Sequence, residues 1–197
     1  MQRTKDAGLL IFGLWLALYG IQGFLLAIYL TFPDLTTFRE LVKYFFVIMS
    51  IPLGNTGQFI IGVFILARMW KVSGAEKVAM LFLSLWLING LFNSLIFDNY
   101  TAGKITYYTS KILGPVAGVL LLNNFHERKM TERVGRILLA VCFFYSFLRA
   151  GINLFFPEIN FNTISMFVYV FYIVSGILLM TSESPSPDQE TIKQIET

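Results

Sequence analysis

The chain has 197 residues, of which 56% are hydrophobic and only 14% are charged. Soluble domains carry about 25% charged residues, so this composition excludes an ordinary globular protein and indicates an integral membrane protein. The formal net charge of +3 is modest. The basic residues cluster in short segments between apolar runs, which is typical of topology control in membranes rather than of nucleic-acid binding.

Six apolar runs are long enough to cross a hydrocarbon core of about 30 Å as helices, which takes about 20 residues each. The runs are continuous rather than alternating between apolar and polar residues, which favours helices over a barrel. We therefore expect an all-α, polytopic bundle of six transmembrane helices in a single domain, residues 1–180. The expected spans are residues 8–30, 51–70, 75–97, 105–125, 133–156 and 162–180. The polar remainder, 181–197, is expected to be a disordered cytoplasmic tail.

Residues 35–49 allow two interpretations. Arg39, Glu40 and Lys43 stand among apolar residues, a pattern typical of a helix that lies in the membrane interface. Pro52 and Gly54 then interrupt the run. We expect an interfacial helix here, and the alternative is one long second span that is kinked at Pro52.

Six spans place both termini on one side of the membrane, and most basic residues at the ends of the spans lie on that side. The positive-inside rule therefore predicts cytoplasmic termini for a multi-pass protein of the cell membrane. The residues on this side are Arg3, Lys5, Arg68, Lys71, Lys77, Arg128, Lys129, Arg133, Arg136 and Lys193, against Arg39, Lys43 and Lys104 on the other.

A short pattern recurs where the first, third and fifth runs leave the membrane. A glycine is followed closely by an amide residue, as in Gly20-Ile21-Gln22 and Gly151-Ile152-Asn153, and an acidic residue comes after the exit. Three related helical hairpins would produce such a pattern. Chance would also produce it, because glycines and acidic loop residues are common.

The side chains needed for metal, redox or nucleophilic chemistry are scarce. The single cysteine, Cys142, lies in an apolar run, which indicates packing, and the single histidine, His126, lies in a charged loop. One copy of the chain therefore cannot build a zinc cluster of His and Cys or a bis-histidine haem site. We expect no metal, no cofactor and no catalytic residue.

Polar residues recur at helical spacing in every run, and the expected topology places them in the extracytoplasmic half. At 1.5 Å per residue, Lys111 lies about 10 Å below Lys104, and Arg149 lies about 12 Å below Pro157. No Asp or Glu is expected at this depth. If both cations face inward, their natural partner is an anion such as a phosphate, a carboxylate or a lipid headgroup. The alternative is that both side chains snorkel to the headgroups.

These features favour a protein that binds or translocates a small anionic or amphiphilic, lipid-like ligand. The polar cavity would open to the extracytoplasmic side above an apolar floor. Lys111 and Arg149 would supply the charge, and other polar side chains would orient the ligand. The candidate ligand-binding residues are Lys111, Arg149, Asn89, Asn93, Tyr107, Tyr145, Asn153, Tyr169 and Gln22.

Two other functions fit the same pattern. Amides and glycines also hold membrane helices together, so the protein can instead be an accessory or assembly subunit of a membrane complex. A membrane enzyme that acts on lipid headgroups is the second alternative. The expected partners are membrane lipid and a membrane protein or a second copy, with no nucleic acid. Close helix packing is the expected role of Gly62, Gly114, Gly118 and Gly176.

Overall fold

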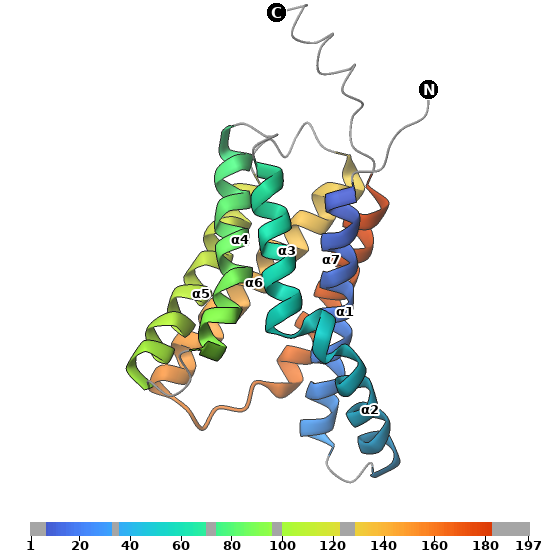
Figure 1. Ribbon diagram of the computed structural model, residues 1–197. Helices are drawn as coiled ribbons and strands as arrows, with labels where there is room; N and C mark the ends of the chain where they lie inside the picture. Colours follow the sequence, from blue (N-terminus) through green and yellow to red (C-terminus); the bar gives the residue numbers. More distant parts are fainter. Residues whose placement is uncertain (1–6, 33–35, 70–73, 96–99, 123–128, 183–197) are drawn as a thin grey trace, which may run out of the picture.

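The computed structural model describes residues 7–32, 36–69, 74–95, 100–122 and 129–182 (Figure 1). Within these ranges the protein is all-helical, which confirms the expected fold class. The helices are α1 (Ala7–Thr31), α2 (Thr36–Leu53), α3 (Asn55–Arg68), α4 (Gly74–Leu95), α5 (Tyr100–Leu121), α6 (Met130–Phe155) and α7 (Asn162–Thr181).

Three of the described helices are long and apolar enough to cross a membrane. They are α1 over Leu10–Thr31, α6 over Met130–Phe155 and α7 over Asn162–Thr181. Shorter apolar stretches occur in α3 (Gly57–Ala67) and in α4 (Lys77–Asn89). This composition is that of a membrane protein. The expected tail and the loop that holds His126 lie outside the described residues.

Helix boundaries agree with the expected runs except around the second span. Of the segment 35–49, the described residues 36–49 are helical as expected, but α2 continues through Pro52 to Leu53, and the break follows at Gly54. Gly54 is extended, with φ −73° and ψ −178°, and therefore interrupts the helix. The kink is therefore at Gly54 rather than at Pro52, and α3 has only 14 residues.

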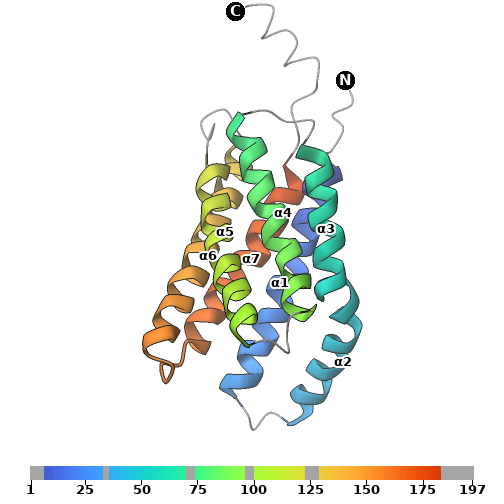
Figure 2. The ribbon, with the colours of Figure 1, turned by 60° about the vertical axis from the view of Figure 1, so that its left-hand side comes forward.

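The helices form a ring. From α3 to α7 each helix packs against the next one in the chain, and α7 then packs along α1, while α2 contacts both α1 and α3. Figures 1 and 2 show that the start of α1 and the end of α7 lie at the same end of this bundle, which we call the terminal end. The short connection between α6 and α7, residues 156–161, lies at the opposite end, which we call the turn end.

The contact between α1 and α7 is built from glycines. A Cβ atom on Gly13 would lie 2.6 Å from the carbonyl oxygen of Gly176, and one on Gly20 would lie 2.7 Å from the carbonyl oxygen of Tyr169. Such a close backbone approach is possible only without side chains, as in other membrane helix pairs. The packing role expected for Gly176 is thereby confirmed.

The other three glycines expected to serve packing also lie at helix contacts. A Cβ atom on Gly62 would lie 2.8 Å from Ile88 on α4. Cβ atoms on Gly114 and Gly118 would lie 3.3 Å from Phe143 and 3.2 Å from Ala140, both on α6. Glycines thus set the spacing of α3 against α4 and of α5 against α6.

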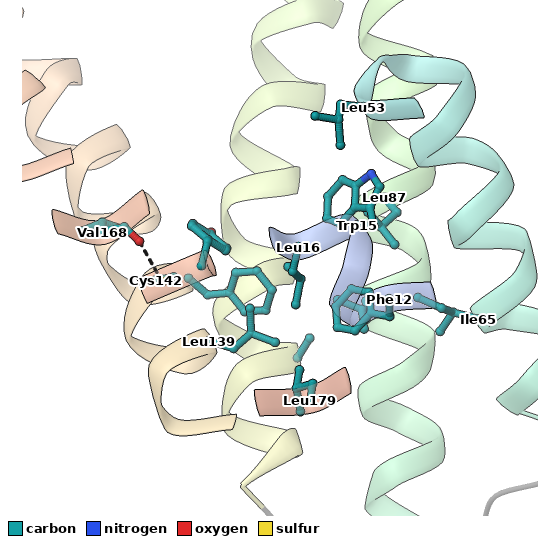
Figure 3. Packing of buried hydrophobic residues seen from close by; sticks show 14 residues of the cluster. Phe12, Trp15, Leu16, Leu53, Ile65, Leu87, Leu139, Cys142, Val168 and Leu179 are labelled. Carbon is teal, nitrogen blue, oxygen red and sulfur yellow. Dashed lines mark hydrogen bonds between the residues drawn. The ribbon is translucent and has the colours of Figure 1, made fainter. Parts of the chain in front are cut away.

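An apolar core fills the ring from the terminal end to its middle (Figure 3). Leu16 on α1 and Leu139 on α6 are fully buried, and Leu179 on α7 is nearly so. Aromatic rings extend this core between α1 and α4, because Trp15 meets Trp86 edge-on with ring centroids 5.8 Å apart. Trp15 also stacks on Tyr19 at 5.2 Å, and Tyr19 lies toward the turn end.

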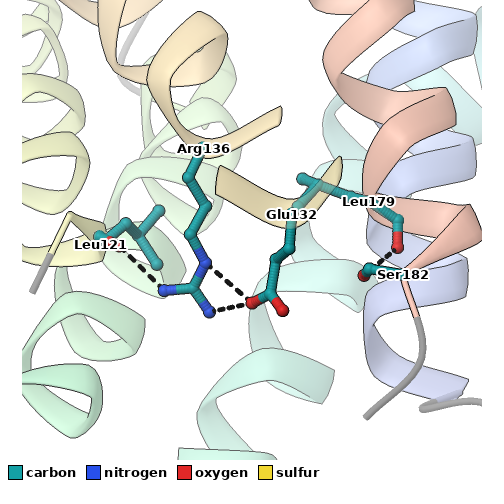
Figure 4. A network of polar contacts seen from close by, with 5 residues as sticks. All are labelled: Leu121, Glu132, Arg136, Leu179 and Ser182. Carbon is teal, nitrogen blue, oxygen red and sulfur yellow. Dashed lines mark hydrogen bonds and ion pairs between the residues drawn. The ribbon is translucent and has the colours of Figure 1, made fainter. Parts of the chain in front are cut away.

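A buried ion pair lies at the terminal end of α6 (Figure 4). Arg136 donates hydrogen bonds from Nε and Nη2 to Glu132 Oε1, at 2.9 and 2.6 Å, and both residues are almost fully buried. Nη1 donates at 2.8 Å to the carbonyl oxygen of Leu121, one of the terminal acceptors that α5 leaves unsatisfied. Arg136, counted in the sequence among the basic residues of this side, is thus paired and buried, because α6 begins at Met130 and holds Glu132 in its first turn.

Candidate functional site

A cavity of about 230 Å³ lies between α1, α5, α6 and α7. Its lining on α6 runs from Cys142 to Asn153, and its lining on α7 runs from Ser165 to Tyr172. These segments belong to the second half of α6 and the first half of α7, so the cavity lies in the half of the ring toward the turn end. Most of its surface is polar.

Lys111 on α5 contacts the neighbouring helix α6. Its Nζ atom donates a hydrogen bond of 3.0 Å to the hydroxyl oxygen of Ser146. The ammonium group also lies 5.2 Å from the centre of the Tyr107 ring, within the range of a cation–π interaction. The side chain therefore lines the cavity between the two helices.

Arg149 makes the corresponding contact between α6 and α7. Its Nη1 atom donates at 2.9 Å to the hydroxyl oxygen of Ser165, and the hydroxyl of Tyr145 lies 2.9 Å from the same oxygen. The Tyr145 hydroxyl also reaches the carbonyl oxygen of Phe161 at 3.4 Å. The Tyr169 hydroxyl is a further neighbour of the guanidinium group. Arg149 thus lies in a network of hydroxyl groups on the two helices.

The two cations share one cavity without a carboxylate from the described part of the chain. Lys111 and Arg149 are close enough for their positive charges to repel each other. Among the described residues no Asp or Glu lines the cavity, and Glu158 is exposed in the connection between α6 and α7. Asp34 and Asp98 lie outside the described residues. The described partners of the two cations are neutral.

The structure brings six of the nine candidate residues together. Those that line the cavity are Lys111, Arg149, Tyr107, Tyr145, Asn153 and Tyr169. Gln22 on α1 and Asn89 on α4 do not line it, and the side chain of Asn93 is outside the part of the chain that the structure describes. Asn89 is excluded because α4 packs between α3 and α5 and forms no wall of the cavity.

The candidate set lacks six other residues that line the cavity. Ser146 and Ser165 are the two that contact the cations directly. Ser146 follows Cys142 by four positions and precedes Arg149 by three, so helical spacing places all three on one face. This spacing is a signal in the sequence for Ser146. The remaining members of the lining are Tyr19, Cys142, Val168 and Tyr172.

The floor of the cavity is apolar. Cys142, Val168 and Tyr172 line the cavity and also belong to the hydrophobic core. The Cys142 thiol donates a weak hydrogen bond of 3.5 Å to the carbonyl oxygen of Val168 (Figure 3). Cys142 therefore packs in the hydrophobic core as expected. It also borders the cavity on the side toward the terminal end.

The arrangement is suited to binding. Hydroxyl groups and two cations can hold an anion in the cavity, whereas the described lining offers no Asp, Glu or His as a general base. In the described ranges no group of His, Cys, Asp and Glu is arranged to hold a metal ion. Comparison of the chain with models of known protein families, with curated proteins and with solved structures finds no match.

Proposed function

We propose that the protein is a six-span membrane protein that binds or translocates a small anionic or amphiphilic ligand through the cavity between α1, α5, α6 and α7. The observation that carries this proposal is that Lys111 and Arg149 line the same cavity and have hydroxyl partners there. Ionisable residues inside membrane helices are costly, and they mark ligand or ion pathways.

An anion would stabilise both side chains at once. Two positive charges at this depth repel each other and are poorly solvated, and the serine hydroxyls compensate them only in part. A ligand with negative charge placed between Lys111 and Arg149 would remove the repulsion and accept several charge-assisted hydrogen bonds. The tyrosine hydroxyls of the lining would add neutral donors.

The lengths of the helices support six spans. α4 and α5 have 22 residues each, about 33 Å, which is enough to cross a core of about 30 Å. α3 alone is about 21 Å long and too short. In the proposed arrangement the last turns of α2, bent at Gly54, complete the second span. The first turns of α2, with Arg39 and Lys43, then lie in the interface.

The outer surface of the ring fits a lipid environment. Large apolar side chains on several helices face outward, among them Leu14 on α1, Ile112 on α5, Phe147 on α6 and Phe167 on α7. The proposed orientation has the terminal end in the cytoplasm, because the basic residues near the spans gather there. The cavity would then be reached from the extracytoplasmic side.

Thermal unfolding in neutral detergent tests the proposal. The protein is compared in potassium phosphate and in potassium chloride at equal ionic strength. Because a ligand that binds only the folded state stabilises it by mass action, phosphate should raise the melting temperature of the wild-type protein. The rise should disappear in Lys111→Gln and in Arg149→Gln, and it should persist in Lys104→Gln, a matched change at an exposed cation of α5. Equal responses of all four proteins would refute the shared site.

A further inference from the structure

We infer that the ligand carries a phosphate monoester, held as a dianion between Lys111 and Arg149. This inference rests on the proposed function and narrows it to one chemical class. Three properties of the cavity support it: the number of positive charges, the number of available donors and the volume. The charge and the donors are matched less well by a carboxylate or by a phosphate diester, and the volume limits the size of the ligand.

The two positive charges of the cavity are balanced by a ligand that carries two negative charges. Lys111 and Arg149 both line it, and the described lining contains no carboxylate. A carboxylate or a phosphate diester carries one negative charge and would leave one cation uncompensated in a poorly solvated place. A phosphate monoester carries about 1.5 to 2 negative charges at pH 7, because its second pKa is about 6. A phosphate monoester is thus an anion whose charge matches the pair.

The donors of the cavity exceed the needs of a carboxylate. An ammonium group has three N–H donors and a guanidinium group has five. Among the described residues, Lys111 donates one hydrogen bond to Ser146, and Arg149 donates to Ser165 with the Tyr169 hydroxyl nearby. Several N–H groups from two helices are therefore left to face the cavity. The three terminal oxygens of a monoester can accept all of these donors, and a guanidinium binds two of them side by side.

The volume of the cavity limits the ligand to about the size of a lipid headgroup. The cavity of about 230 Å³ is smaller than the roughly 300–1,000 Å³ of sites that enclose a whole drug-sized molecule. A phosphate with a short substituent fits, whereas a diacylated lipid would have to leave its chains outside. Tyr107 lines the cavity and is 41% exposed, so the cavity reaches the surface of the bundle beside α5. A soluble monoester and a lipid monoester present the same chemistry to this site.

Calorimetric titration of the full chain in neutral detergent distinguishes these classes. The probes are glycerol 3-phosphate, acetate, dioctanoyl phosphatidic acid and dioctanoyl phosphatidylglycerol, which represent a soluble monoester, a carboxylate, a lipid monoester and a lipid diester. At pH 7.5 at least one monoester should bind ten times or more tightly than acetate and the diester. From pH 7.5 to pH 5 its affinity should fall about tenfold, since the dianionic fraction falls by that factor around a pKa of about 6.

The protein should contribute little to this pH dependence. The titratable and charged side chains that face the site are Tyr19 on α1, Tyr107 and Lys111 on α5, Cys142, Tyr145 and Arg149 on α6, and Tyr169 and Tyr172 on α7. Side chains of these types titrate above pH 7.5 in model peptides. The Lys111→Gln and Arg149→Gln variants should each lose at least tenfold in affinity for the monoester. Lys111→Arg and Arg149→Lys, which keep the charge, should retain most of it.

The outcomes separate this inference from the proposed function. Binding of both monoesters indicates a soluble ligand or a headgroup alone, and binding of phosphatidic acid only indicates a lipid; either result supports the inference. Acetate or the diester can instead bind as tightly as the monoesters, with binding that depends on Lys111 and Arg149. In that case the inference of a dianionic ligand is wrong, and the proposed anion site is supported. If no anion binds to the wild-type protein, both the inference of a phosphate monoester and the proposed function are wrong.

Discussion

Lys111 on α5 donates a 3.0 Å hydrogen bond to the hydroxyl of Ser146 on α6, and this contact joins two walls of the cavity. In Ser146→Ala the ammonium group loses this acceptor. Interhelical hydrogen bonds in membrane proteins contribute about 0.6 kcal/mol on average and up to about 1.7 kcal/mol. We expect a loss near the upper value, because the donor is charged and partly buried. Denaturant unfolding in mixed micelles measures the loss.

Thr109→Ala is the matched control for Ser146→Ala. The Thr109 hydroxyl is exposed on α5 and donates to the carbonyl oxygen of Ile105 in its own helix. Its removal breaks no contact between helices and should change the free energy of unfolding by less than about 0.5 kcal/mol. A loss in Thr109→Ala as large as that in Ser146→Ala would show that the contact between Lys111 and Ser146 adds nothing.

Gly176→Ala should destabilise the protein, whereas Gly151→Ala should not. A Cβ atom on Gly176 would collide with the carbonyl oxygen of Gly13 and would lie 2.7 Å from the backbone nitrogen of Ala17, so α1 and α7 must move apart. Overpacking of this kind costs about 1–3 kcal/mol. A Cβ atom on Gly151 meets no atom within 4 Å. That change should be neutral or stabilising by up to about 1 kcal/mol, since Ala is the better helix former.

Unfolding free energies of the two glycine variants, measured under identical conditions, give the comparison. Both substitutions add one methyl group to a long helix, so the difference between them isolates the contact with α1. A Gly176→Ala protein as stable as the wild type would show that α1 and α7 are not in close backbone contact.

Glu132→Gln should be strongly destabilising because it removes the carboxylate charge that contacts Arg136 in a buried place. Breaking one half of a buried ion pair costs about 3–5 kcal/mol, while replacing both halves by apolar residues is often nearly neutral. The double variant Glu132→Leu/Arg136→Met should therefore be more stable than Glu132→Gln alone. Thermal unfolding of the wild type, Glu132→Leu, Arg136→Met and the double variant forms a double-mutant cycle that gives the coupling energy. A coupling energy near zero would contradict the buried pair.

The arrangement of the helices predicts which exposed residues face each side of the membrane. Glu158 at the turn end and Lys129 at the terminal end are both exposed. Single cysteines at these positions should react with an impermeant maleimide from opposite sides of the membrane, with Glu158→Cys labelled from outside intact cells. Cys142 is fully buried and should not react. Labelling of both positions from the same side would overturn the proposed orientation and the access route to the cavity.

Much of the helical structure could be predicted from the sequence, because continuous apolar runs leave no other way to satisfy the backbone in lipid. The partners of the helices could not. Helical spacing tells which face of a helix is polar or carries small residues, but it does not tell which other helix meets that face. The contact of Gly13 with Gly176 joins the first and the last helix of the described structure. No local pattern in the chain indicates this pairing.

The candidate site shows the same limit. The rise per residue of a helix predicts a similar depth for Lys111 and Arg149, but it does not predict that both face one cavity. Asn89 meets the same depth criterion and is nevertheless outside the cavity, since α4 stands elsewhere in the ring. Serines are poor signals for a site, because they also bond to their own helix, as Ser84 does with the carbonyl oxygen of Met80.

The pairing of α1 with α7 also bears on how the protein is made. During synthesis α1 enters the membrane first, and the glycine-lined face that it offers to α7 has no partner until more than 130 further residues have been added. Contacts between such distant segments form late in folding. Tyr19 on α1 and Tyr172 on α7, whose ring centroids lie 5.4 Å apart, both line the cavity. A nascent chain therefore has no closed cavity before α7 is inserted, and α1 must be shielded by lipid or by the insertion machinery until then.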